Sequence, residues 1–162
     1  FRHYNITAFG RLDFADVPDE PFARLYYAAF AIAQSVRDNL LFIQRIFTDS
    51  ADNIAIANEF LKSEMEERTR VIVGLLEECA AIDDGVPTAT IQRLGYLSSA
   101  VIAPMVLGTR FNSMELLSDE LSQNVGALLT DEAISQRLEW AVCAMFPSRL
   151  ECVGIRPDRK KQ

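Results

Sequence analysis

Apolar residues recur every three or four positions along most of this chain, which is the period of a helix that buries one face. The pattern predicts helices over residues 21–38, 40–48, 52–82 and 88–107, over about a dozen residues from Ser118, and over 131–146 with Thr130 as its cap. The middle of the longest predicted helix, KSEMEERTR, is strongly charged. We therefore predict an all-α fold, a bundle of about six helices.

Capping residues and prolines indicate where these helices begin and end. Residues 19–21, Asp-Glu-Pro, suit the first turn of the first helix because a carboxylate there accepts hydrogen bonds from free backbone amides. Thr88 or Thr90 is the expected start of the fourth helix. Pro104 lacks a backbone N–H and clashes with the preceding turn, so it is expected to kink or end that helix. Residues 109–117 are then expected to form a connector.

The chain length fits one domain. A chain of 162 residues buries well over half of the surface that it exposes when unfolded, so it needs no disulfide or metal to fold. We predict a linker over residues 1–20, one helical domain over 21–148 and a polar tail over 149–162.

Charge and cysteine content exclude several classes of protein. The net charge of −7 argues against direct binding of nucleic acid, which relies on clustered lysine and arginine. Cys79, Cys143 and Cys152 lack CxxC spacing, which argues against a disulfide framework and a zinc site. A reducing, cytoplasmic location is the default expectation. No apolar run reaches the roughly 18 residues that span a bilayer, so no membrane segment is expected.

The sequence offers little for catalysis. Its one histidine, His3, lies near the chain start, away from the residues that a Ser-His-Asp or Cys-His arrangement would need. No glutamate is followed three residues later by histidine, the spacing used by dimetal sites in helix bundles. GxGxxG and P-loop patterns are also missing from the sequence. We predict that the chain is not an enzyme and uses no metal or cofactor.

Aromatic and methionine side chains are frequent on the predicted helices, and such side chains often line apolar pockets. Tyr26 and Tyr96 also carry hydroxyl groups that can orient a ligand. Glu64 and Arg68 lie close to the apolar stripe of the long helix, where each needs a charged partner or a ligand. The candidate ligand-binding residues are Tyr26, Phe30, Phe60, Glu64, Arg68, Tyr96, Met105 and Phe111. The alternative is that the aromatic residues fill the core and that Glu64 and Arg68 form a salt bridge at its rim.

Two predicted helices, 88–107 and 131–146, carry apolar residues on more than one side. Helices of this kind often form a four-helix bundle between two subunits, so we predict a homodimer. The candidate interface residues are Leu94, Leu97, Val101, Ile102, Ile134, Leu138, Ala141, Val142 and Met145. The alternative is that these residues are buried within one chain.

The order of the predicted elements resembles the regulatory domain of TetR-family transcriptional regulators over about residues 22–146. RDNLLFIQRIF resembles the family's short helix, and FLKSEMEERTRVIVGLLEECAAID resembles its long helix. TATIQRLGYLSSAVIAPMVLG and DEAISQRLEWAVCAMF resemble its two dimer helices. Phe1-Arg2-His3-Tyr4 fits the aromatic-x-His-aromatic pattern that commonly ends the family's DNA-reading domain, so the linker at 1–20 would contain the end of that domain.

The resemblance implies a transcriptional repressor whose helix-turn-helix domain lies outside this chain and makes all contacts with DNA. A small apolar or aromatic effector would enter the domain at 21–148, between the first, the long and the first dimer helix. Its binding would change the separation of two DNA-reading heads in a homodimer. The kinked helix at Pro104 is the candidate for the element that shifts. The alternative function is a helical protein–protein interaction or scaffold domain without a small-molecule ligand.

Overall fold

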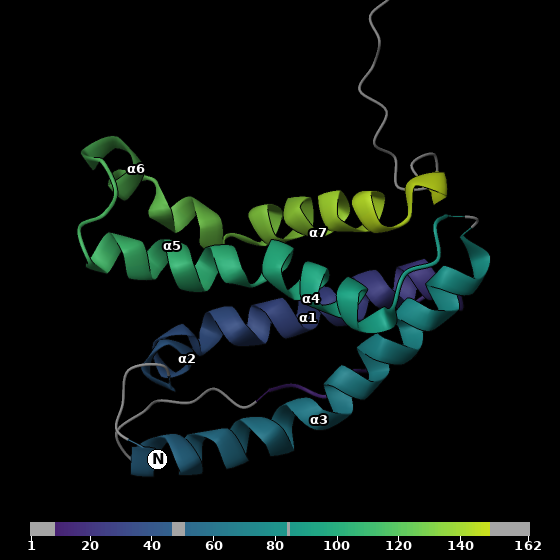
Figure 1. Ribbon diagram of the computed structural model, residues 1–162, viewed down its shortest axis with the longest axis horizontal. Helices are drawn as coiled ribbons and strands as arrows, with labels where there is room; N and C mark the ends of the chain where they lie inside the picture. Colours follow the sequence, from purple (N-terminus) through teal and green to yellow (C-terminus); the bar gives the residue numbers. More distant parts are fainter. Residues whose placement is uncertain (1–8, 47–50, 84, 150–162) are drawn as a thin grey trace, which may run out of the picture.

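The computed structural model describes residues 9–46, 51–83 and 85–149, and every regular element within these ranges is helical. The helices are α1 (Pro21–Asp38), α2 (Leu40–Ile46), α3 (Ala51–Ile82), α4 (Thr90–Val101), α5 (Ala103–Ser113), α6 (Asp119–Gln123) and α7 (Asp131–Met145), and two 3-10 turns follow at Val125–Leu129 and Pro147–Arg149 (Figure 1). The all-α prediction is confirmed. His3, Cys152 and the Phe1–Tyr4 pattern lie outside the described residues.

Local capping explains where α1 and α7 begin. The Glu20 carboxylate accepts hydrogen bonds from the amides of Phe22, at 3.1 Å, and Ala23, at 2.8 Å, while Pro21 occupies the first helical position. At α7, the Thr130 hydroxyl accepts a hydrogen bond from the amide of Ala133 at 3.1 Å. Both starts agree with the sequence prediction, because side-chain caps act within a few residues of the helix that they begin.

The predicted helix at 88–107 is instead two helices that meet at a bend of 45°. The helix α4 ends at Val101, and Pro104 lies in the first turn of α5, where its missing N–H costs nothing. The prediction of a connector at 109–117 was therefore wrong over its first part, since α5 continues to Ser113. The expected start at Thr88 or Thr90 is confirmed at Thr90, the first residue of α4, although the preceding Ala89 makes no side-chain cap hydrogen bond.

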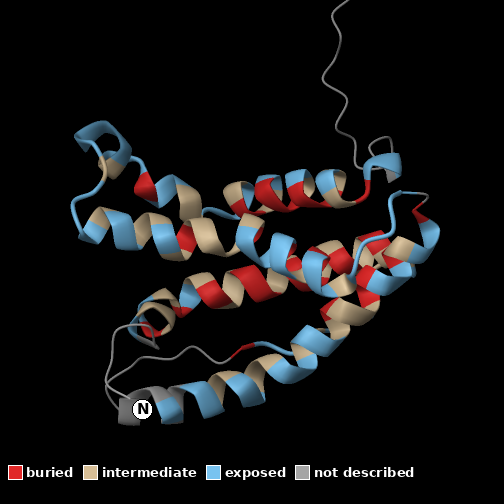
Figure 2. Ribbon diagram, in the orientation of Figure 1, coloured by how far each residue is buried: buried red, intermediate tan, exposed pale blue. Residues whose placement is uncertain are grey.

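Four helices enclose the core. The helix α1 packs against α3 and α7, while α4 packs against α3 and α7 (Figure 1). Buried positions follow the inward faces of these helices, as the red segments of Figure 2 show. The side chains that are less than 2% exposed and largest in volume are Phe146, Leu25, Leu76, Met105, Ile134, Leu138 and Cys79.

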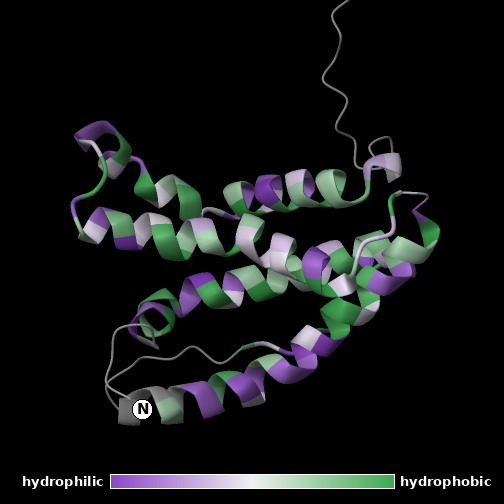
Figure 3. Ribbon diagram, in the orientation of Figure 1, coloured by the Kyte–Doolittle hydropathy of each residue, from purple (hydrophilic) through white to green (hydrophobic). Residues whose placement is uncertain are grey.

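The first half of α3 lies apart from this core. Figure 3 shows it as mostly hydrophilic, in agreement with the charged sequence KSEMEERTR. Two ion pairs lie along this segment: Arg68 is 3.5 Å from Glu64, the salt bridge that the sequence left as an alternative, and Arg70 is 3.6 Å from Glu66. The fully buried positions of α3 begin at Ile72, so the second half of the helix supplies most of its contribution to the core, with Met65 partly buried against it.

Candidate functional site

A small apolar cavity lies between α1, α3 and α4. Its volume is about 70 Å³. Its lining residues are Ala29 and Ile32 from α1, Met65, Thr69 and Ile72 from α3, and Leu94, Leu97, Ser98, Val101 and Ile102 from the end of α4. Only two of these residues, Thr69 and Ser98, bring a polar side chain, so the cavity favours an apolar occupant.

A larger groove lies on the other side of the α4–α5 bend, facing α2. Its volume is about 450 Å³, and its lining residues are Ile43, Gln44, Ser98, Ser99, Ile102, Ala103, Val106, Leu107 and Arg110. Ser98 and Ile102 line both this groove and the inner cavity. The two hollows are therefore neighbours around the residue at which α4 ends, and we refer to them together as the bend cleft.

The bend leaves the Val101 carbonyl of α4 without its usual helical partner. In a continuous helix the carbonyl of Val101 would accept a hydrogen bond from the amide of Met105. Here the amide of Met105 donates to Ile102, at 3.1 Å. The guanidinium of Arg137, from α7, donates through Nε to the Val101 carbonyl at 3.2 Å and through Nη2 to Leu128 at 3.0 Å. Arg137 thus fixes the bend from the core side.

Arg137 is only 8% exposed, and it donates hydrogen bonds to two backbone carbonyls of the described chain rather than to a carboxylate. Burial lowers the pKa of this guanidinium below its ordinary value. The side chain nevertheless stays protonated at neutral pH, because an arginine titrates far above that range. A buried charge of this kind is stabilised by its hydrogen bonds to the two carbonyls.

A second contact fixes the bend from the α2 side. The side-chain amide of Gln44 donates to the Thr109 hydroxyl at 2.5 Å and to the Val106 carbonyl at 3.3 Å. These bonds join α2 to α5 across the floor of the outer groove. The N–H donors of the Gln44 amide are therefore used within the chain.

None of the eight predicted ligand-binding residues lines the bend cleft. Tyr26 stacks on Phe30 with ring centroids 6.2 Å apart, and its hydroxyl is hydrogen-bonded to that of Ser135. Phe60 meets Phe42 edge to face at 5.7 Å. These aromatic side chains pair with neighbours in the fold, which agrees with the alternative that they fill it.

The remaining predicted ligand-binding residues are also used elsewhere or lie apart. Arg68 donates from Nη2 to the carbonyls of Phe9, at 2.9 Å, and Gly10, at 2.6 Å, and its guanidinium lies 5.4 Å from the centroid of the Phe9 ring. It holds the segment before α1 against α3, with Glu64 beside it. Met105 is fully buried in the core. Tyr96 and Phe111 are exposed on α4 and α5.

The predicted interface residues pack within the chain. Those that are no more than 4% exposed are Leu97, Val101, Ile134, Leu138, Ala141 and Val142, and those partly buried against the same core are Leu94, Ile102 and Met145. For these side chains the alternative of burial within one chain describes the structure. Four of them, three on α4 and Ile102 directly after it, also line the inner cavity. They are therefore unavailable as a contact surface, and the homodimer stays a prediction.

Sequence reasoning missed Arg110, Arg137 and the two serines of α4 as site residues. One signal was present: Pro104 marked the bend around which the cleft forms. The small residues of α4 were a weaker signal, because Ser98 and Ser99 leave space only if a neighbouring helix fails to fill it. Whether the space beside these serines is filled depends on the position of α1 and α2, which no local sequence pattern predicts.

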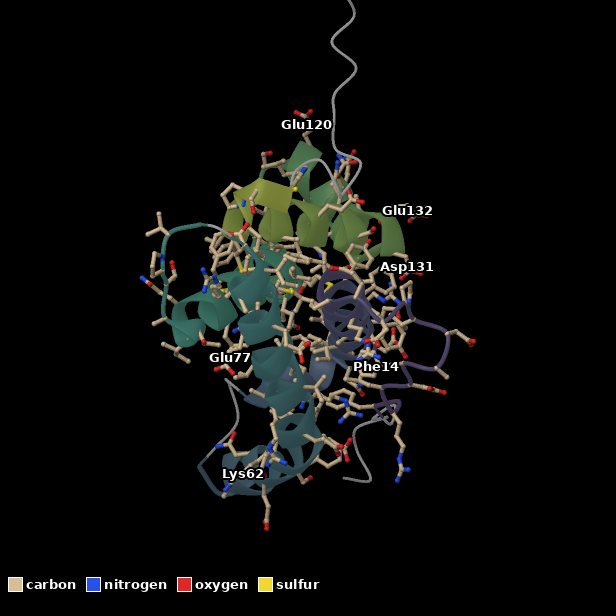
Figure 4. The ribbon with its side chains drawn as sticks, turned by 90° about the vertical axis from the view of Figure 1, so that its right-hand side faces the viewer. Phe14, Lys62, Glu77, Glu120, Asp131 and Glu132 are labelled. Atoms are coloured by element: carbon tan, nitrogen blue, oxygen red, sulfur yellow. The ribbon has the colours of Figure 1, made fainter. Side chains whose placement is uncertain are left out.

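The described residues contain no cluster of histidine, cysteine or acidic side chains that could hold a metal ion. Figure 4 shows Glu77, Glu120 and Glu132 projecting from different sides of the molecule. Desolvation, with the nearby charge of Glu139, raises the pKa of the Cys143 thiol, so this group stays protonated at neutral pH.

The length and hydropathy of the helices in the described residues bear on whether the chain can cross a membrane. No single helix there is long and apolar enough to cross a membrane. The pair α4 and α5 meets the test of length and composition only when the two are joined across their bend of 45°. Their apolar residues Leu97, Val101 and Met105 are buried in the core of the chain.

The helices follow one another in the order expected from the resemblance, from an initial helix through a short and a long helix to the pair that packs together, α4 and α7. This order defines a fold class and no more. No protein-family model, curated protein or solved structure matches the chain.

Proposed function

We propose that this chain is a ligand-sensing helical domain that binds a small apolar molecule in the bend cleft. The observation that carries the proposal is the position of the cleft, whose apolar walls come from helices on both sides of the α4–α5 joint. Apolar hollows with a few polar groups are the usual form of a small-molecule site. The occupant gains free energy by leaving water, since nearly all of the lining surface is apolar.

The joint is also a place where an occupant can influence the fold. Ile102 lines both the inner cavity and the outer groove, and it directly follows the last residue of α4. A molecule that fits the cleft at one bend angle better than at another shifts the protein toward the first. The coupling can only be as large as that difference in affinity. Arg137 and Gln44 set the bend in the unliganded chain.

We further propose that the sensing domain belongs to a TetR-like transcriptional regulator. Its support is the order of the helices and the location of the inner cavity between α1, α3 and α4, the three helices that the resemblance implies for an effector. In such a regulator the effector alters DNA binding by a helix-turn-helix domain encoded upstream. A basic segment of about 45 residues with that pattern, directly before Phe1 in the gene, is the expected observation.

The proposed regulator is a homodimer that associates through the outward faces of α4 and α7. Tyr96 and Trp140 lie on these two helices, which pack side by side, and are 47% and 58% exposed. Large aromatic side chains are enriched at protein interfaces. We propose this exposed surface as the dimer interface in place of the interface residues predicted from the sequence, which are buried or partly buried within the chain.

Thermal unfolding in the presence of decan-1-ol or naphthalene tests whether the cleft binds apolar molecules. At a hundred times the dissociation constant, binding adds about 2.7 kcal/mol to the free energy of unfolding. For a chain of this size that corresponds to a rise of about 5–11 °C in Tm. The variant S98F places a phenyl ring where the two hollows meet and should abolish the rise. The matched control S63F, on the exposed part of α3, should keep it; an equal rise in both variants refutes the site.

A second candidate function is a helical interaction domain without a small-molecule ligand. It is favoured by a group of exposed apolar side chains around the end of α5 and α6: Leu107, Phe111, Met114, Leu116 and Leu121. Exposed apolar groups of this kind often mark protein contacts. This function predicts no change in Tm with either probe.

A further inference from the structure

We propose that the ligand of the bend cleft is an amphipathic carboxylate, an unbranched aliphatic acid whose tail enters the inner cavity and whose carboxylate binds Arg110. This inference rests on the proposed function, because it assigns a ligand class to the same cleft. Three features carry it: the narrow inner end, the length of the apolar groove and the single charge at its far end.

The inner cavity favours a chain over a ring. Its volume is about 70 Å³, whereas a cavity known to accept benzene in another protein has a volume of about 150 Å³. A polymethylene tail is narrower than an aromatic ring and can enter a hollow of this size from one end. The lining of Ile32, Ile72 and Leu97 offers it only apolar contacts.

The outer groove continues in the direction that such a chain would take. It runs along the bent helices from Ser98 to Arg110, a path of about 18 Å at the rise of an α-helix. Along this path the groove is lined by Ile102, Ala103 and Val106. An extended aliphatic ligand can therefore keep nearly its whole length against apolar surface while its polar end reaches solvent.

Among the described residues, Arg110 is the only charged one that lines either part of the cleft. Its side chain makes no hydrogen bond or ion pair with the described part of the chain, so its donors are open to an acceptor. A guanidinium can hold both oxygens of a carboxylate in a bidentate pair. The charge lies at the end of the groove opposite to the inner cavity, which fixes the orientation of the ligand.

The overall charge of the protein opposes an anion only weakly at this point. The net charge of −7 is spread over the whole chain, and charges more than about 8 Å apart are largely screened at physiological salt. The contribution of an exposed Arg110 will itself be modest and will fall with added salt. Arg110 therefore gives a preference for carboxylates among the apolar ligands that the cleft binds.

The test compares decanoate with decan-1-ol, two probes that share a tail length and differ in head group. Binding is measured by calorimetry below the concentration at which either probe aggregates. Wild type should bind decanoate about fivefold more tightly, which corresponds to an exposed ion pair of about 1 kcal/mol. This preference should shrink as salt is added.

The variant R110Q should bind the two probes with equal affinity. The control R70Q removes an exposed arginine from α3, away from the cleft, and should keep the preference of wild type. If wild type binds both probes equally, or R110Q keeps the preference, the carboxylate inference is wrong while the apolar site stands. If neither probe binds in a way that S98F abolishes, the proposed function fails and this inference with it.

Discussion

Replacing Arg137 by methionine tests the contact that fixes the bend. The substitution R137M keeps a long side chain of similar length in the same buried place but removes every hydrogen-bond donor. It leaves the carbonyls of Val101 and Leu128 without the partner that they have now, at 3.2 and 3.0 Å. The Val101 carbonyl has no helical substitute, because the amide of Met105 donates to Ile102.

The size of the effect follows from two opposing terms. Hydrogen bonds from a charged donor contribute about 1.5–3 kcal/mol each, so losing two costs about 3–6 kcal/mol. Part of this is offset because the guanidinium no longer has to be buried, the same desolvation that lowers its pKa. We expect a net loss of about 2–4 kcal/mol in the free energy of unfolding, once that offset is included. For a domain of this size the loss lowers Tm by about 4–16 °C.

Calorimetric unfolding of wild type, R137M and R137K measures this loss. The lysine variant keeps the charge but has no planar fork to reach both carbonyls, so its Tm should lie between the other two. The control R70M removes an arginine whose side chain is 76% exposed and should change stability by less than about 0.5 kcal/mol. A Tm for R137M within the error of wild type would refute the assignment of Arg137 as the residue that holds the bend.

Three further predictions concern the core, the start of α7 and association. The variant L138A removes a fully buried side chain and should cost about 2–5 kcal/mol, measured by denaturant unfolding. Hydrogen bonds from Arg37 and then Gln34 lower the pKa of Asp131 below its ordinary value of 3.8. Their stabilisation is therefore present above pH 3.8 and is lost as pH falls through the lower, folded value, so wild type should lose more stability there than D131N. The variant W140E should dissociate the proposed homodimer in sedimentation experiments, since it places a charge on an exposed face of α7.

Each of these three predictions can be refuted by a specific result. A loss below about 1 kcal/mol in L138A would mean that the site is not packed as described, and the exposed L121A serves as its control. Parallel stability curves for wild type and D131N would show that the ion pair with Arg37, at 2.6 Å, does not contribute. A wild-type chain that sediments as a monomer at high concentration would rule out the homodimer.

Local sequence was a reliable guide to the helices with side-chain caps. Glu20 and Thr130 could be assigned from the sequence because each caps a helix that begins at the next residue. The start of α4 at Thr90 also agrees with the prediction, although this helix begins without a side-chain cap hydrogen bond, as a helix can when tertiary contacts stabilise it. The break at Pro104 was predicted correctly, but the local sequence did not indicate that a new helix would continue past residue 109.

The site was less accessible to sequence reasoning than the helices. The aromatic residues looked suited to a ligand, yet Tyr26 and Phe60 are paired with Phe30 and Phe42 inside the fold. Apolar periodicity identified Val101 as a buried position without saying what covers it. Whether such a residue meets a second subunit, a ligand or its own chain depends on how neighbouring helices pack.

The sequence by itself determined the all-α class, the positions of the main helices and the break at Pro104, because these depend on interactions within a few residues. Only the tertiary structure decided that Arg137 meets the free carbonyl of Val101 and that Ser98 faces unfilled space. The physical reason is that periodicity states which face of a helix avoids water but not which partner it meets. A cavity is a mismatch between the surfaces of several helices, so it exists only once those helices have packed together.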